Sequence, residues 1–394
     1  MRLLSLAALA AIAAATPVQA QDTQQSPVIV VTGGSLDQTA RRLDACIAGQ
    51  CDPRQDINAS LAHAENQFLA GDYAAARATL AKSIRRNERY RATMPVDVSD
   101  LQRAYGRLVD VTGQPDSARL VQIDALDSLK TGLGGADQRV FVQRMLVGDQ
   151  FAQAGRIRAA EDVYRKVERQ AAKAGLPQVS ALAVLRRAKL YGTLSQFGPS
   201  YRQDYAATLA QLERLPGAEM GQFRLAAAVL RAQDAARRND ESQIDAVIAT
   251  MDAGQLTRPY LIYAPAIELH QIRSAMPPSS AGRPAEWADV RVVVRPDGRV
   301  EECEILRQSA QLDQALMRKV TDSIARRRYT PYLQGEGKPL AYRIERFSFV
   351  QDWWTGENRM SGNSRVRKQN VDARLAWLDL TPDDAPLGTG TTGS

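Results

Sequence analysis

Three cysteines and two histidines are the side chains of this sequence with the widest range of chemistry. Cys46 and Cys51 are separated by four residues, in a C-x4-C arrangement, and are close enough to form a disulfide bond in an oxidising compartment. A zinc site would need two further ligands, and only His63 and His270 could add histidine nitrogens. The spacing therefore favours a local disulfide bond over a metal site.

No motif in the sequence is typical of a catalytic site. An active site needs convergent polar groups, usually with a histidine, a metal ion or a nucleophile beside a base. The sequence contains no G-x-S-x-G, H-E-x-x-H, phosphate-binding loop or dinucleotide fingerprint. We therefore expect a protein that is not an enzyme, uses no cofactor and binds no small-molecule substrate. A hydrolase with a carboxylate pair assembled by the fold is the alternative.

The composition is that of a soluble globular protein of two or three domains. The chain has 394 residues, of which 44% are hydrophobic and 24% charged. Its formal net charge is +7, and the basic residues are spread along the chain, with Arg326 to Arg328 as the tight cluster. Such a cluster at a helix end is typical of a solvated group that complements the helix dipole. Because basic and aromatic residues are not interleaved, we expect no binding to nucleic acid.

The first twenty residues predict a secretory signal peptide. Arg2 precedes an apolar run, residues 3–15, and small residues end the segment at Ala20, where we expect cleavage. The run is short for a bilayer, which takes about 20 apolar residues, so a retained membrane anchor is the less favoured alternative. No later stretch is apolar enough to span a membrane, so we expect no stable span after cleavage.

Residues 58–276 are predicted to form stacked helical hairpins. Small residues at Ala64, Gly71 and Ala76, with Tyr73 and Leu80 between or after them, have spacing similar to that of tetratricopeptide repeats. Small residues let two antiparallel helices approach closely, and the larger ones fill the remaining gap.

Equally spaced glycines extend this pattern along the chain. Gly71, Gly113 and Gly155 are 42 residues apart, and Gly198 and Asn239 fall near the next two expected turns. The period is longer than the usual tetratricopeptide length of about 34 residues, so longer helices or connections are expected. Such stacks commonly present a concave binding groove, which we favour over a simple spacer.

After a linker at residues 277–286 that is rich in proline and serine, the period changes to that of strands. Val290, Val292 and Val294 alternate with other residues, as in a strand with one buried face. A turn at residues 295–298 leads to a returning strand, residues 300–306. Cys303 lies on this strand and is expected to be a small core residue rather than a reactive thiol.

A helix and a final strand complete this region. Leu312, Leu316, Val320 and Ile324 are four residues apart and form one apolar stripe, with Ala315 beside it, that needs a sheet to cover. The last predicted strand begins at Ala341 and ends at residue 349. The predicted order is ββαβ, with one helix across a small antiparallel sheet.

The segment 287–349 resembles the C-terminal domain of TonB, the periplasmic adaptor of bacterial outer-membrane transport. The resemblance rests on a V-x-V-x-V strand, a D-G hairpin, a helix with L-D-x-A-L-x-x-x-V and an R-x-Y-x-P-Y exit, all in the same order. It implies a non-catalytic protein-binding domain, here taken as residues 287–350, and a periplasmic location. The fold class is thus an α-helical solenoid followed by a small α+β domain.

By the same resemblance, the last strand would receive a segment of a partner as an added strand. The residues implied are Tyr342, Arg343, Ile344, Glu345, Arg346 and Phe347. The alternative is that the tail after Val350 covers this edge, with Trp353 and Trp354 packed over it, because exposed edges are usually protected.

A second short segment is similar to the TonB box of outer-membrane TonB-dependent receptors. It comprises Val28, Ile29, Val30, Val31 and Thr32, whose β-branched side chains favour an extended strand. It could pair with the TonB domain of another protein or with the last strand of this chain. The simpler interpretation is an apolar strand packed on the first helices.

These observations predict a periplasmic adaptor that binds proteins of the periplasm or outer membrane, with TonB-dependent receptors among the candidates. The sequence carries a helical array where TonB has a membrane anchor and a proline-rich spacer, which argues against energy transduction. The alternative is an envelope scaffold or assembly factor in which the TonB-like domain is a docking unit. Residues 21–57 would hold the disulfide, and the tail 351–394 is expected to be partly disordered.

Overall fold

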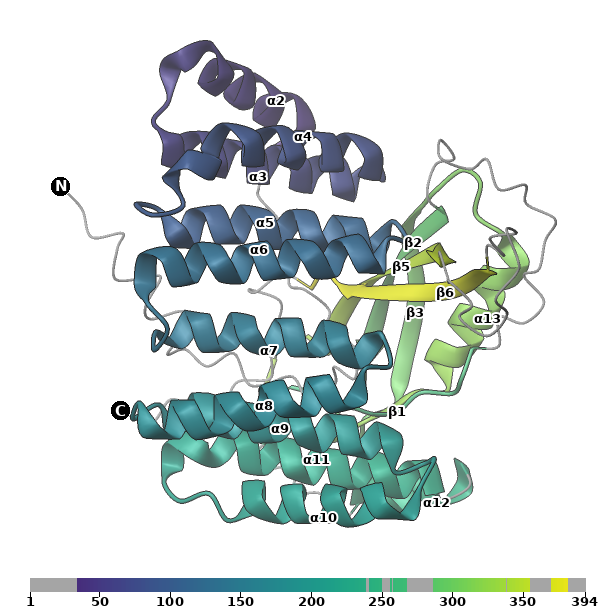
Figure 1. Cartoon of the computed structure of the whole chain (residues 1–394). Coiled ribbons are helices and arrows are strands. Elements are labelled where there is room, and N and C mark those ends of the chain that lie inside the picture. Colours follow the sequence, from purple (N-terminus) through teal and green to yellow (C-terminus); the bar gives the residue numbers. More distant parts are fainter. Residues whose placement is uncertain are drawn as a thin grey trace, which may run out of the picture.

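The computed structural model describes residues 34–238, 241–249, 256, 258–267, 286–337, 339–354 and 370–381. A stack of helices is followed by a sheet with one helix, and the two parts lie side by side (Figure 1). This arrangement confirms the predicted fold class. The predicted signal peptide, the segment Val28–Thr32, residues 277–285 of the linker and most of the tail lie outside the described residues.

The helical stack, defined as α2 to α12, consists of antiparallel hairpins. The turn glycines Gly71, Gly113 and Gly155 have φ values of 84°, 81° and 70°, which favour glycine, and each lies between the two helices of a hairpin. Gly198 directly precedes α10, while Asn239 falls between α11 and α12, outside the described residues. The helices are α2 (Leu36–Ala45), α3 (Pro53–Leu69), α4 (Tyr73–Asn87), α5 (Pro95–Val111), α6 (Pro115–Leu133), α7 (Gln138–Gln153), α8 (Ile157–Lys173), α9 (Pro177–Leu194), α10 (Pro199–Glu213), α11 (Gly221–Arg238) and α12 (Glu241–Ala249).

Small residues allow the helices of a hairpin to approach closely. A Cβ atom on Gly148 of α7 would lie 2.7 Å from the ring of Tyr164 in α8, and one on Gly106 of α5 would lie 2.9 Å from the amide of Gln122 in α6. In the first hairpin, the predicted contact residues such as Ala64 are buried. The spacing of small and large residues therefore corresponds to the observed packing.

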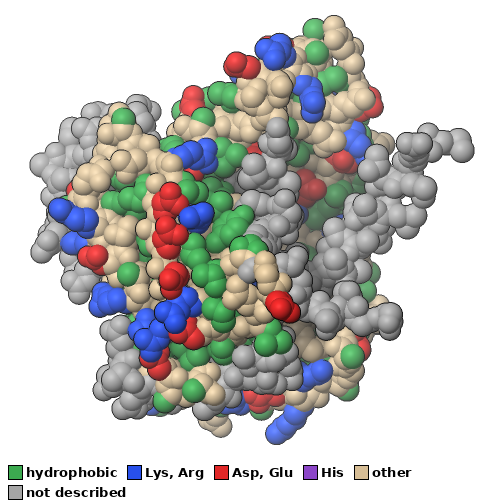
Figure 2. Space-filling view, turned by 180° about the vertical axis from the view of Figure 1, so that it is seen from behind, with side chains coloured by type: hydrophobic (Ala, Val, Ile, Leu, Met, Phe, Trp, Pro, Cys, Tyr) green, Lys and Arg blue, Asp and Glu red, His purple; other side chains and the backbone are tan. Residues whose placement is uncertain are grey.

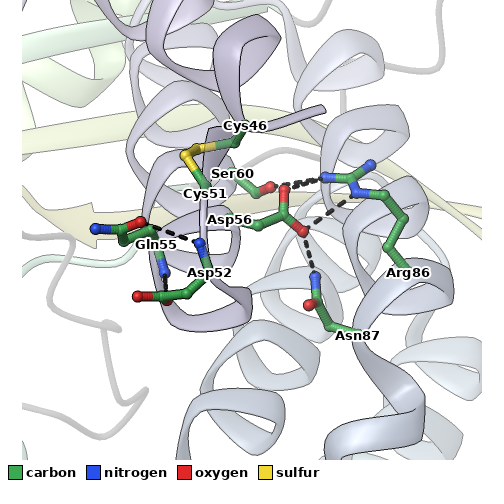
Figure 3. The surroundings of a disulfide bond; sticks show 8 residues. All are labelled: Cys46, Cys51, Asp52, Gln55, Asp56, Ser60, Arg86 and Asn87. Carbon is green, nitrogen blue, oxygen red and sulfur yellow. Dashed lines mark hydrogen bonds and ion pairs between the residues drawn. A yellow bond between two sulfur atoms is a disulfide. The ribbon is translucent and has the colours of Figure 1, made fainter. Parts of the chain in front are cut away.

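Cys46 and Cys51 are joined by a disulfide bond between α2 and α3 (Figure 3). Asp52 follows directly and caps α3, accepting a hydrogen bond from the backbone N–H of Gln55 at 2.9 Å. About one turn further on, the buried Asp56 accepts a hydrogen bond from Arg86 of α4 at 2.7 Å. The disulfide and this ion pair hold the start of α3 against its neighbours on both sides.

The sheet part, residues 286–381, contains a four-stranded antiparallel sheet in the order β3-β2-β5-β6. Its elements are β2 (Glu286–Val294), β3 (Val300–Gln308), α13 (Gln314–Ala325), β4 (Arg328–Tyr329), β5 (Ala341–Trp354) and β6 (Asn370–Asp379). The predicted ββαβ order is present, and β4 and β6 are additions. β6 shows that part of the predicted tail is an ordered strand.

One strand lies in the region predicted to be entirely helical. β1 (Leu261–Tyr263) pairs with β4 of the sheet part. Pro259 and Pro265 flank this segment and prevent a helix from continuing through it. The predicted boundary of the repeats at residue 276 is therefore too late.

Helix α13 covers one face of the sheet. All four residues of the predicted stripe are buried, and Leu312, Val320 and Ile324 share a core cluster with Val290, Val292 and Val294 of β2. The helix begins at Gln314, where Asp313 caps it, so Leu312 lies just before its first turn. Met317 is buried, whereas Ala315 is exposed. Within the described residues, no helix combines the length and apolar composition needed to cross a membrane.

Candidate protein-binding site on the sheet

The six residues predicted to form an open edge lie in the first half of β5. On one side, β5 pairs with β2, from Ala341 opposite Val294 to Phe349 opposite Glu286. On its other side it pairs with β6, beginning at Glu345 opposite Asp379. The prediction of an open edge is therefore corrected for Ile344 to Phe347. β6 pairs with Glu345, Arg346 and Phe347, and Ile344 forms hydrogen bonds with Leu380 and Thr381. Within the described residues, this backbone pairing does not reach Tyr342 or Arg343. Covering the edge satisfies backbone N–H and C=O groups that would otherwise be exposed.

The side chains of β5 alternate between two buried environments. Arg343, Glu345 and Phe347 share the sheet face that carries α13. Ile344 and Arg346 point to the opposite face, which packs on the helical stack. These positions hold the sheet between two layers, so their first role is structural.

Arg346 forms the centre of the contact between the sheet and the helices. Its side chain is fully buried and makes a bidentate ion pair with Asp289 of β2, at 2.6 Å and 2.9 Å. The guanidinium also donates to the backbone carbonyls of Phe68 and Leu69 at the end of α3, the second at 2.8 Å. It stacks on the Trp287 ring, 3.9 Å from the ring centroid. One side chain thus joins two strands to the C-terminus of a helix.

Two further contacts surround Arg346. A Cβ atom on Gly71, in the turn after α3, would lie 2.2 Å from the indole nitrogen of Trp287. The hydroxyl of Tyr73, the first residue of α4, lies 2.9 Å from the hydroxyl oxygen of Ser348 in β5. The first helical hairpin and the sheet therefore fit closely together around the Trp287 side chain.

The opposite face of β5 carries a network of buried charges. Glu345 is 1% exposed and accepts a hydrogen bond from Arg327 at 2.7 Å. Arg343 lies 3.3 Å from Glu345 and donates to Asp379 of β6 at 2.6 Å. Burial lowers the pKa of Arg327, but its interactions with Glu345 and Tyr329 together outweigh this and raise the pKa above its ordinary value. The network links β5, β6 and the segment after α13.

The sheet part also contacts the other end of the helical stack. Asp245 of α12 forms ion pairs with Arg299 and with Arg328, the second at 3.1 Å. Tyr260 and Thr330 exchange hydrogen bonds, since the Thr330 N–H donates to the Tyr260 carbonyl at 2.7 Å and the Tyr260 N–H donates to the Thr330 hydroxyl at 2.9 Å. The sheet part is thus joined to both the first hairpin and the last helix of the stack.

β3 is an outer strand of the sheet, and nearly all its side chains are exposed. Arg291 of β2 bridges Glu302 and Glu304 of β3 at 3.2 Å each. Figure 2, a view from the side opposite to Figure 1, shows acidic and basic side chains next to one another on this side of the molecule. The charges of this strand are therefore largely paired by neighbours.

Cys303 lies on β3 and is half-buried beside the core under α13. Burial raises the pKa of its thiol to about 11, so the thiol stays protonated at neutral pH. We expect its alkylation at pH 7.5 to be on the order of 100-fold slower than that of an exposed cysteine with an ordinary pKa. Mass spectrometry of the non-reduced protein treated with iodoacetamide measures this rate, and the chain unfolded in guanidinium is the control. Equal rates in the two states would contradict a protected thiol.

The amino-acid sequence alone did not point to the residues that bind Arg346. Asp289 is an acidic residue between the apolar residues Ala288 and Val290, and this position was the available signal. The roles of Trp287 and Gly71 in the contact depend on segments more than 200 residues apart, so no local pattern pointed to them. Among the described residues, no group of three or more histidine, cysteine or acidic side chains is placed to hold a metal ion.

Comparison with known proteins identifies one segment of the chain. Residues 288–350 match the family model described as Gram-negative bacterial TonB protein C-terminal. No curated protein matches the chain. Among solved structures, the chain is similar to the crystal structure of BtubC (BKLC) from P. vanneervenii, with 16% sequence identity and a TM-score of 0.41, over 55% of this chain and 92% of that chain. That likeness is too low to support a conclusion. Residues 288–350 are therefore a TonB C-terminal domain, joined in this chain to a stack of helices.

Proposed function

We propose that this chain is a non-enzymatic, protein-binding adaptor of the Gram-negative cell envelope, which acts in the periplasm after export. The TonB C-terminal domain supports a role in the envelope, and helical stacks of this kind commonly bind proteins. The predicted signal peptide supports export.

The observation that carries this proposal is the attachment of the sheet part to both ends of the helical stack. Arg346 binds the end of α3, while Asp245 of α12 binds Arg299 and Arg328. Because these contacts include buried and charged groups, the two parts hold a fixed geometry, unlike domains on a flexible linker. Two partners bound to the two parts would therefore be held at a set distance.

A second candidate function, an envelope scaffold or assembly factor, is favoured by the position of β6. While β6 pairs with β5, a receptor segment cannot add to the edge of β5. In a scaffold the TonB C-terminal domain would act as a docking unit, with no role in outer-membrane transport.

Photo-crosslinking in a Gram-negative host tests the proposal. A photoreactive residue is placed at Tyr342 on β5 or Glu302 on β3, with Lys166, exposed on α8, as the control position. Capture of an outer-membrane receptor from Tyr342, absent from Lys166, would support the transport adaptor. Capture of envelope-assembly proteins would support the scaffold. Failure of both sheet positions to capture any envelope protein above the control would contradict protein binding by this domain.

A further inference from the structure

β6 occupies the edge of β5 where a strand could be added, and its last residues have specific partners there. The backbone N–H of Leu380 donates to the Ile344 carbonyl at 2.7 Å, and the Ile344 N–H donates to the Thr381 hydroxyl at 3.0 Å. These two hydrogen bonds extend the pairing beyond the end of β6. In the second, the Thr381 hydroxyl oxygen takes the place of a backbone carbonyl as the acceptor.

Asp379 supplies the charged contact of β6. Its carboxylate accepts a hydrogen bond from the buried Arg343 at 2.6 Å and also accepts from the backbone N–H of Thr381 at 3.0 Å. Arg343 in turn lies 5.7 Å from the centroid of the Trp377 ring. An acidic residue at this position balances a charge that β5 presents to any strand beside it.

Leu378 and Leu380 supply the apolar contacts. Both are buried in the cluster that contains Phe68, Trp287 and Leu108, on the sheet face turned toward the helical stack. Because residues 378 and 380 alternate with Asp379, one sheet face takes the apolar side chains and the other takes the carboxylate. The edge therefore selects an order of apolar, acidic, apolar and hydroxyl side chains.

We infer that β6 is a resident ligand of the β5 edge, and that a partner engages this edge by replacing β6 with an extended segment of the same pattern. This inference rests on the proposed protein-binding function and adds the chemistry of the partner segment. The pattern is that of Leu378, Asp379, Leu380 and Thr381: an acidic residue between two apolar residues, followed by a hydroxyl.

The chain segment that connects β5 to β6 determines how strongly β6 competes with a free peptide for the edge of β5. Trp354 and Asn370 are paired, and the chain between them is short, so β6 is held near its site at an effective concentration on the order of millimolar. A free peptide that makes the same contacts must reach a similar concentration before it displaces half of β6. A substitution that weakens β6 alone should therefore expose the site to a peptide at much lower concentration.

The test uses the full chain and a fluorescent peptide with the sequence of residues 370–381. For the unchanged chain we expect half-saturation at roughly 1 mM or above. For Asp379→Ala, whose Arg343 can pair with the intact peptide, we expect at least tenfold tighter binding by fluorescence anisotropy. Thr381→Val, which loses the hydroxyl's bonds to Ile344 and Asp379 but keeps the Asp379 carboxylate, is a milder second variant and should tighten binding severalfold. A peptide that itself carries Asp379→Ala should not show this tighter binding to the Asp379→Ala chain, because it cannot pair with Arg343.

A reversible disulfide bond between β5 and β6, called the lock below, supplies the matched control. Gln351 and Ala373 face one another across β5 and β6, so Gln351→Cys with Ala373→Cys, introduced into the Asp379→Ala chain, can join the strands by a disulfide. Peptide binding should vanish in the oxidised form and return on reduction. Binding that is unaffected by the lock, or no tighter in folded Asp379→Ala and Thr381→Val chains, would overturn the inference. If the peptide replaces β6 but photo-crosslinking captures no envelope protein, the inference about the β5 edge would be supported and the proposed adaptor function would be contradicted.

Discussion

Arg346→Met is expected to lower the free energy of unfolding by about 3–5 kcal/mol, as found when one partner of a buried ion pair is removed. Asp289, 1% exposed, would keep only its contact with Arg307, and the Leu69 carbonyl would lose its hydrogen bond from the guanidinium. Methionine fills a similar volume, so the loss measures polar contacts more than packing. Chemical denaturation followed by circular dichroism measures the change.

Arg307→Met is the matched control, because Arg307 binds the same Asp289 carboxylate at 2.6 Å with a side chain that is 52% exposed. Exposed ion pairs contribute about 0–1 kcal/mol, so we expect a change within that range. Equal effects of the two substitutions would contradict the central position given to Arg346. A normal free energy of unfolding for Arg346→Met would show that the sheet and the helices are not joined in this way.

Gly71→Ala is expected to lower the free energy of unfolding by about 2–5 kcal/mol. A residue with a side chain costs roughly 1–2 kcal/mol in the left-handed conformation, here with φ of 84°. The added methyl group also overlaps the Trp287 indole, whose displacement from a packed site costs about 1–3 kcal/mol. Thermal unfolding of the two proteins, followed by tryptophan fluorescence, measures both the loss and the altered surroundings of Trp287.

Gly155→Ala separates the two causes. Gly155 occupies the equivalent turn of the third hairpin with φ of 70°, but a Cβ atom there would meet no other atom within 4 Å. Its cost should therefore be the backbone cost alone, roughly 1–2 kcal/mol. A double variant of Gly71→Ala and Arg346→Met should lose less than the sum of the two, because both act on Trp287. Full additivity would mean that the two sites are independent.

Much of the fold could be predicted because its signals are local. The turn glycines at 71, 113 and 155 require positive φ, and their spacing is visible without any contact map. The alternation of Val290, Val292 and Val294 follows from the two-residue period of a strand, and the stripe of α13 follows from the period of a helix. The family match at residues 288–350 confirms that these patterns occur in the order expected of a TonB C-terminal domain.

The candidate site was predicted less well, because burial of an edge depends on distant segments. The sequence placed Tyr342 to Phe347 on a strand, but it could not specify that residues 370–379 would pair with that strand. In the sequence, Arg346 cannot be distinguished from an arginine on the exposed face of a strand. Its buried state becomes visible only with Asp289 and the end of α3 in place.

The sequence by itself determined the helical hairpins, the small sheet with its covering helix and the family of residues 288–350, since each depends on residues close together in the chain. The tertiary structure alone decided which strand edge is covered, which arginine is buried and how the sheet joins the helices. Those features depend on pairings such as Arg346 with Leu69, separated by 277 residues, and no local periodicity encodes such a contact.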